Sequence, residues 1–106
     1  MIIKTNLIPN GFDAMTLWPF ILVRPTQADN KGLIEHELVH YREQAFLTPI
    51  WWLRYLLIKS FRLNAEVRAY KRQIEVNGIS IFTAASYLTK YHLNITVDDA
   101  VKLLTV

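Results

Sequence analysis

The segment Ile34–Ala45, IEHELVHYREQA, decides how the rest of this sequence is interpreted. Its apolar side chains recur at helical spacing, at Ile34, Leu38, Tyr41 and Ala45. The spacing predicts a helix that ends before Thr48-Pro49, because a proline disfavours helical geometry in the residue before it. His36 and His40 fall nearly opposite the apolar stripe, so we expect them not to be core residues.

The same helix carries the pattern HExxH over residues 36–40. Residues four apart on a helix are separated by about 40° around its axis, so the imidazoles of His36 and His40 project side by side. Two such nitrogens bind one zinc ion at about 2.1 Å each. Glu37 can then reach a water activated by the metal and take its proton. The pattern predicts a Zn2+ site with Glu37 as general base.

A catalytic zinc usually has three protein ligands. The chain has no cysteine, so the third must be a histidine or a carboxylate. His92 is the only other histidine, whereas Glu66 lies on a predicted helix, with Tyr70 one turn later on the same face. A helix over Ile50–Leu63 would allow the chain to cross and return, so Glu66 is the better candidate.

The motif HELVH, followed by a helix that bears Ala65-Glu66, resembles the gluzincin branch of zinc metallopeptidases. More narrowly, it resembles short HExxH proteins of phages and bacteria, over about Met15 to Arg72. The resemblance implies a minimal zincin-like metallopeptidase domain with Glu37 as general base and three zinc ligands, which are His36, His40 and Glu66.

One position departs from the thermolysin-like pattern. Those enzymes have an aspartate four residues after the ligand glutamate, where it orients the first histidine, and this chain has Tyr70 there. Tyr70 is predicted either to assist catalysis by orienting His36 or Glu66 through its hydroxyl, or to be a core tyrosine. The oxyanion-stabilising group is left open among Tyr70, Tyr87, Tyr91 and His92.

The chain of 106 residues is long enough for one domain, and 52% apolar residues are enough for one core. Met1–Ile8 and Met15–Arg24 read as extended segments separated by a turn at Pro9-Asn10-Gly11. Pro19 lacks a ladder donor and suggests an edge strand or a bulge. We therefore predict an α+β fold over 1–106, with a small N-terminal antiparallel sheet. Its edge strand either binds an extended substrate or merely packs beside the motif helix.

Four or five helices are expected after this sheet. Asp29 and Asn30 are candidate caps of the motif helix, and Thr96 with Asp99 forms a capping-box pattern for the last one. The helices expected beyond the motif are Ile50–Leu63, a helix capped by Asn64 that runs to Val76 and ends at Asn77-Gly78, Ser80 to His92, and a short helix to Leu104.

The segment from Arg54 to Arg72 is basic, with aromatic residues interleaved. In Ile50–Leu63 the leucines share one half of the helix, and Trp51, Tyr55 and the basic residues crowd the other. We favour a core helix whose leucines and tryptophans pack inside while its long basic side chains reach water. Peripheral contact with a membrane is the next alternative. Nucleic-acid binding is disfavoured, because the charges form no single clean face.

The sequence thus predicts a cytoplasmic, zinc-dependent enzyme that hydrolyses peptide bonds in a peptide or protein substrate. A chain of this size offers only a shallow cleft, so a protein partner or a homo-oligomer is expected to complete its specificity. Two alternatives stay open: a non-catalytic zinc-binding module and a membrane-surface interaction module.

Overall fold

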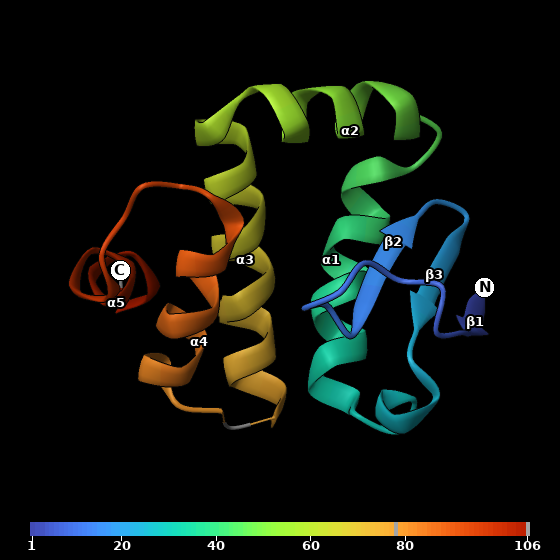
Figure 1. Cartoon of the computed structure of the whole chain (residues 1–106), viewed down its shortest axis with the longest axis horizontal. Helices are drawn as coiled ribbons and strands as arrows, with labels where there is room; N and C mark the ends of the chain where they lie inside the picture. Colours follow the sequence, from blue (N-terminus) through green and yellow to red (C-terminus); the bar gives the residue numbers. More distant parts are fainter. Residues whose placement is uncertain (78, 106) are drawn as a thin grey trace.

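The computed structural model describes residues 1–77 and 79–105, and its N-terminal part is a small three-stranded sheet (Figure 1). The strands are β1 (Ile2–Lys4), β2 (Ala14–Leu17) and β3 (Phe20–Val23), in the order β1-β3-β2. The predicted α+β class is confirmed. One pairing differs from the antiparallel sheet we expected: β2 is antiparallel to β3, but β1 is parallel to it, so the sheet is mixed.

The second extended segment is two strands rather than the one predicted over Met15–Arg24. The chain reverses at Trp18-Pro19, whose peptide bond is cis, and β2 and β3 form a hairpin around it. Pro19 therefore lies in a turn, where its missing N–H costs no ladder hydrogen bond, and not within an edge strand or a bulge. Its carbonyl accepts a hydrogen bond from the N-terminal amino group at 3.0 Å.

The motif helix, α1 (Lys31–Gln44), forms where the sequence predicted it. It follows a short 3-10 turn, η1 (Pro25–Gln27). Of the two candidate caps, Asn30 caps the helix by accepting a hydrogen bond from the N–H of Leu33 at 3.1 Å.

The buried face of α1 is polar, which reverses our expectation for this helix. Its buried side chains belong to the motif and to Gln44, whereas the predicted core stripe is half-buried at Ile34, Leu38 and Tyr41 and exposed at Ala45. A polar face can be buried when each group finds a partner. Here α1 lies between the sheet and a long helix that supplies those partners (Figure 1).

The predicted helix over Ile50–Leu63 is two helices, α2 (Thr48–Leu57) and α3 (Lys59–Asn77), joined at an extended residue, Ile58. Asn64 is therefore inside α3 and caps nothing. The break is stabilised by Arg62, because its guanidinium donates to the carbonyls of Tyr55 and Leu56, which have no helical donor at the end of α2. The predicted stop at Asn77-Gly78 falls partly outside the described residues, since Gly78 is not among them.

The leucines of α2 also face the opposite way from our expectation. Trp51 and Tyr55 are buried, while Leu53, Leu56 and Leu57 are exposed. The preferred prediction, a core helix with its leucines and tryptophans inside, is therefore wrong for these leucines, whereas the burial of Trp51 agrees with it. Trp51 shares the inward face with Tyr55, and their stacked rings have centroids 4.9 Å apart.

The C-terminal part adds α4 (Ile81–Leu88), the 3-10 turn η2 (Thr89–Tyr91) and α5 (Val97–Thr105), which pack on α3. The helix predicted to reach His92 thus ends earlier, and His92 has left-handed geometry. The capping box is confirmed: the N–H of Asp99 donates to the Thr96 hydroxyl, and the N–H of Thr96 donates to the Asp99 carboxylate. None of the helices in residues 1–77 and 79–105 is long and apolar enough to cross a bilayer.

Candidate metal centre

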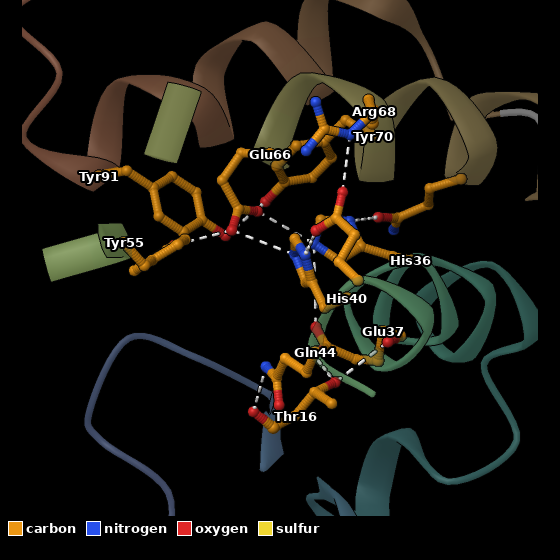
Figure 2. A network of polar contacts seen from close by, with 12 residues as sticks. Thr16, His36, Glu37, His40, Gln44, Tyr55, Glu66, Arg68, Tyr70 and Tyr91 are labelled. Atoms are coloured by element: carbon orange, nitrogen blue, oxygen red, sulfur yellow. Dashed lines mark hydrogen bonds and ion pairs between the residues drawn. The ribbon is translucent and has the colours of Figure 1, made fainter. Parts of the chain in front are cut away.

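Three side chains with metal-ligand chemistry converge between α1 and α3. Nε2 of His36 lies 3.1 Å from Oε1 of Glu66, and Nε2 of His40 lies 3.2 Å from Oε2 of the same carboxylate. One ligand atom from each residue lies within 4.8 Å of the others. All three side chains are buried, and Figure 2 shows both imidazoles directed at the carboxylate. The structure thus brings together the three residues that the sequence singled out as metal ligands.

The path of the chain explains this convergence. His36 and His40 are one turn apart on α1, so their rings lie on the same face. α2 crosses from the end of α1 to the start of α3, and α3 returns beside α1 (Figure 1). Glu66 lies in the second turn of α3 and therefore faces the histidine pair.

Both histidines are oriented through Nδ1. The Nδ1–H of His36 donates to the side-chain oxygen of Gln73 at 3.0 Å, and that of His40 donates to Oε1 of Glu43 at 3.3 Å. Glu43 is fixed in turn by Arg68, whose Nε lies 2.7 Å from Oε2. Such outer contacts set the tautomer of a metal-binding histidine. Here they leave Nε2 of each neutral ring as the atom with a free lone pair.

The geometry around Glu66 therefore calls for positive charge. In the neutral tautomers just described, each Nε2 presents a lone pair to a carboxylate oxygen, which is itself only an acceptor. Nε2 of His40 is buried and has no hydrogen-bond partner among the described residues. Either protons on the imidazoles or a metal ion between these atoms would satisfy them. The donor set of two imidazoles and one carboxylate fits zinc.

The pKa shifts of His40 and Glu66 agree with the need for positive charge beside the carboxylate. Burial by itself lowers the pKa of His40, but the Glu66 carboxylate and the contact with Glu43 raise it to about 10. Burial by itself raises the pKa of Glu66, yet His40 and His36 hold it well below its usual range. In the metal-free protein His40 is therefore protonated against an ionised Glu66, and a metal ion would take the place of that proton.

Tyr55 supplies the direct hydrogen bond to the ligand carboxylate. Its hydroxyl donates to Oε2 of Glu66 at 2.7 Å. Burial and the nearby Glu66 raise the pKa of Tyr55 far above its ordinary value, so the hydroxyl keeps its proton. Sequence reasoning missed Tyr55, Gln73 and Glu43. Gln73 is seven residues after Glu66 and Glu43 three after His40, so spacing offered a signal for both, but nothing local marks Tyr55.

Glu37 lies beside the three ligand residues but is not one of them. Its Oε1 accepts a hydrogen bond from the Thr16 hydroxyl at 2.8 Å, and its Oε2 lies 3.8 Å from Nε2 of His36 (Figure 2). Thr16 belongs to β2 and is itself buried. One carboxylate oxygen is thus held by the sheet, while the other is near Nε2 of His36.

Tyr70 contacts the centre through its ring. The ring lies edge-on to His36, with centroids 4.4 Å apart, and its hydroxyl is 3.0 Å from that of Tyr91. The hydrogen bond to His36 that we considered for Tyr70 is made by Gln73, and the one to Glu66 by Tyr55.

A cavity of about 680 Å³ reaches the centre. His36, Glu37, His40 and Glu66 all line it. Most of its remaining wall is apolar, with Phe12, Met15, Trp51, Trp52 and Leu56 among the residues that form it. Of the four groups considered for an oxyanion, Tyr91 and His92 line this cavity, while Tyr70 and Tyr87 line a second one of about 320 Å³.

Comparison with known proteins returns no match: no family model, curated protein or solved structure is detectably similar to this chain.

Proposed function

We propose that this protein is a zinc-dependent peptidase, in which His36, His40 and Glu66 hold the metal and Glu37 moves the proton. The observation that carries the proposal is the convergence of two imidazole nitrogens on one buried carboxylate, with a second carboxylate beside them and a cavity leading in. Three protein ligands are typical of catalytic zinc, whereas structural zinc usually has four.

Zinc in such a centre supplies Lewis acidity, which polarises a carbonyl and makes water acidic near neutral pH. Glu37 would act as the base. Because Thr16 donates to Oε1, Oε2 is the oxygen free to accept a proton from the attacking water. As the water oxygen bonds to the carbonyl carbon and the C–N bond breaks, Glu37 returns that proton to the leaving amine.

The resemblance to gluzincins agrees with this proposal. The main departure from the thermolysin-like pattern concerns the residue that orients the first histidine, and a contact from Gln73 takes its place. Where the thermolysin-like pattern orients the first histidine with an aspartate four residues after the ligand glutamate, this chain has Tyr70. The orienting contact to Nδ1 of His36 comes instead from Gln73, nearly two turns after Glu66 on α3.

A peptide or protein is the substrate class we propose, because the cavity combines an apolar wall with the polar centre.

The free edge of β2 is partly used by the protein itself. The Thr16 carbonyl accepts hydrogen bonds from Gln44 at 2.9 Å and from Trp52 at 3.2 Å, so an extended substrate would have to bind elsewhere on this edge. Substrate specificity, a protein partner or homo-oligomer and a cytoplasmic location stay predictions.

A non-catalytic zinc-binding module is the second candidate, and the burial of all three ligand residues favours it.

The test of the peptidase proposal uses the isosteric change Glu37→Gln, which removes the base but none of the ligands. The zinc-loaded proteins are incubated with labelled casein and with a mixed peptide library analysed by mass spectrometry. We expect Glu37→Gln to keep its zinc and to lose activity by about 100-fold or more.

Glu35→Gln is the matched control, since Glu35 is on the same helix and pairs with Arg72 at 3.5 Å, away from the ligands. Its activity should equal that of the wild type. Undiminished hydrolysis by zinc-loaded Glu37→Gln would disprove the mechanism. A zinc-loaded wild type that cleaves nothing would favour the non-catalytic module.

A further inference from the structure

The outward face of α2 and its two ends carry a row of exposed apolar side chains. Its side chains are between 46% and 83% exposed. We call this surface the α2 ridge; it consists of Phe46, Leu47, Ile50, Leu53, Leu56, Leu57 and Ile58. So many large apolar side chains on one short segment mark an interaction surface, because single exposed leucines are common but contiguous patches are not.

The ridge is convex. α2 lies across the ends of α1 and α3 at the margin of the molecule, so its outer face protrudes (Figure 1). Its inner face is already used, because Trp51 and Tyr55 are buried against the rest of the protein. A protruding helix with apolar side chains along its outer face suits a soft, flat medium into which those side chains can sink.

The charge beside the ridge has one sign. The sequence has no Asp or Glu from Ala45 to Ala65. Arg54 and Lys59 are exposed within this stretch and make no ion pair with any residue of the described chain. Two basic side chains farther along α3 differ in this respect: Arg68 pairs with Glu43, and Arg72 pairs with Glu35 and Glu75.

We propose that the α2 ridge docks on the surface of an anionic lipid bilayer. α2 would lie in the plane of the interface, with its leucines among the upper parts of the acyl chains and with Arg54 and Lys59 at the lipid phosphates. A helix of ten residues is about 15 Å long, so it lies on a bilayer and does not span its core of about 30 Å.

The charge pattern favours a bilayer over a second copy of the chain. A symmetric dimer through the ridge would place the same acid-free surface against itself and bring Arg54 and Lys59 near their own copies. An anionic bilayer instead offers negative charge opposite both residues. Leu56 belongs to the ridge and also lines the cavity, so docking would place the cavity beside the membrane surface.

The experiment is sedimentation of the purified protein with lipid vesicles, made of phosphatidylcholine alone or with about 30 mol% phosphatidylglycerol. We expect binding to the anionic vesicles that weakens in high salt. The double substitution Leu53→Ser with Leu57→Ser should lower binding by about tenfold or more. Both side chains are exposed, so the variant should stay folded, which circular dichroism checks.

Phe82→Ser is the matched control, because Phe82 is 70% exposed on α4, outside the ridge, and its removal should leave binding unchanged. Glu37→Gln should bind vesicles like the wild type, so the docking surface and the proposed catalysis can fail independently. Absence of wild-type binding, or equal binding by the leucine variant, would refute the proposal. Sedimentation without lipid gives one more outcome that would refute the proposal. If the wild type self-associates, the leucine variant does not, and neither binds vesicles, the ridge is an interface with a second copy of the chain.

Discussion

At the scale of single residues, the centre depends on groups that orient the ligands. Tyr55, on α2, donates a hydrogen bond to Oε2 of Glu66. Gln73, on α3, accepts one from Nδ1–H of His36. Each contact fixes a side chain before any metal arrives, which reduces the entropy lost on binding. The affinity of the centre for zinc should therefore depend on residues that do not touch the metal.

Tyr55→Phe tests this dependence, because it removes one hydroxyl and keeps the ring that stacks on Trp51. We expect the dissociation constant for zinc, measured by competition with a chromophoric chelator, to rise by about tenfold. Tyr41→Phe is the control, since Tyr41 is half-buried and its ring contacts Trp18, away from the ligands. An unchanged zinc affinity in Tyr55→Phe would contradict the orienting role.

The ligands could be predicted from the sequence more readily than the residues that orient them. His36, Glu37 and His40 lie within little more than one helical turn, so helix geometry alone places them together. The prediction of Glu66 as a ligand depended on the resemblance to gluzincins and on the expectation that the chain crosses and returns to the motif helix. The contact of Tyr55 depends on how α2 packs over α3, which no spacing along the chain encodes.

At the scale of elements, β2 positions Glu37, the proposed base on α1. Gln44 is fully buried and bridges the two elements, because its amide donates to the Thr16 carbonyl and accepts from the N–H of Trp18 at 2.8 Å. The Thr16 hydroxyl then holds Oε1 of Glu37. The strand therefore contacts the Glu37 carboxylate through one hydroxyl.

Thr16→Val keeps the shape of the side chain and removes this hydrogen bond. We expect it to lower peptide hydrolysis by about tenfold with zinc content unchanged, and to destabilise the protein by about 1–3 kcal/mol, because Glu37 loses a buried donor. Enzyme assays and urea unfolding measure the two effects. Thr26→Val, at an exposed threonine of η1, should change neither. Full activity in a folded, zinc-loaded Thr16→Val would show that β2 does not position the base.

The element predictions failed where long-range contacts decide. The break at Ile58 follows no Pro or Gly, so the apolar run from Ile50 to Leu63 gave no local sign of two helices. This apolar run also did not indicate which face of α2 is inward, since apolar residues lie on both faces of the helix. The parallel pairing of β1 with β3 likewise depends on where distant segments meet.

At the scale of the whole molecule, two different interiors stabilise the fold. α3, α4 and α5 share an ordinary apolar core built around Ala84, Ala85 and Leu88. Between α1 and α3 the interior is polar, with His36, His40 and Glu66 at its centre. Burying three ionisable groups is costly unless they are paired or bind a metal. This half of the molecule therefore depends on the contacts of His36 and His40 with the Glu66 carboxylate.

Metal binding by His36, His40 and Glu66 is tested most directly by elemental analysis of the protein, purified without an affinity tag. The wild type should hold about one zinc ion per chain. Glu66→Gln, which keeps the size of the side chain and removes its charge, should lose most of it while circular dichroism shows an intact fold. Glu75→Gln, at an exposed glutamate on the same helix, should keep it. A wild type without zinc after reconstitution, or a Glu66→Gln protein with the full complement, would contradict the account.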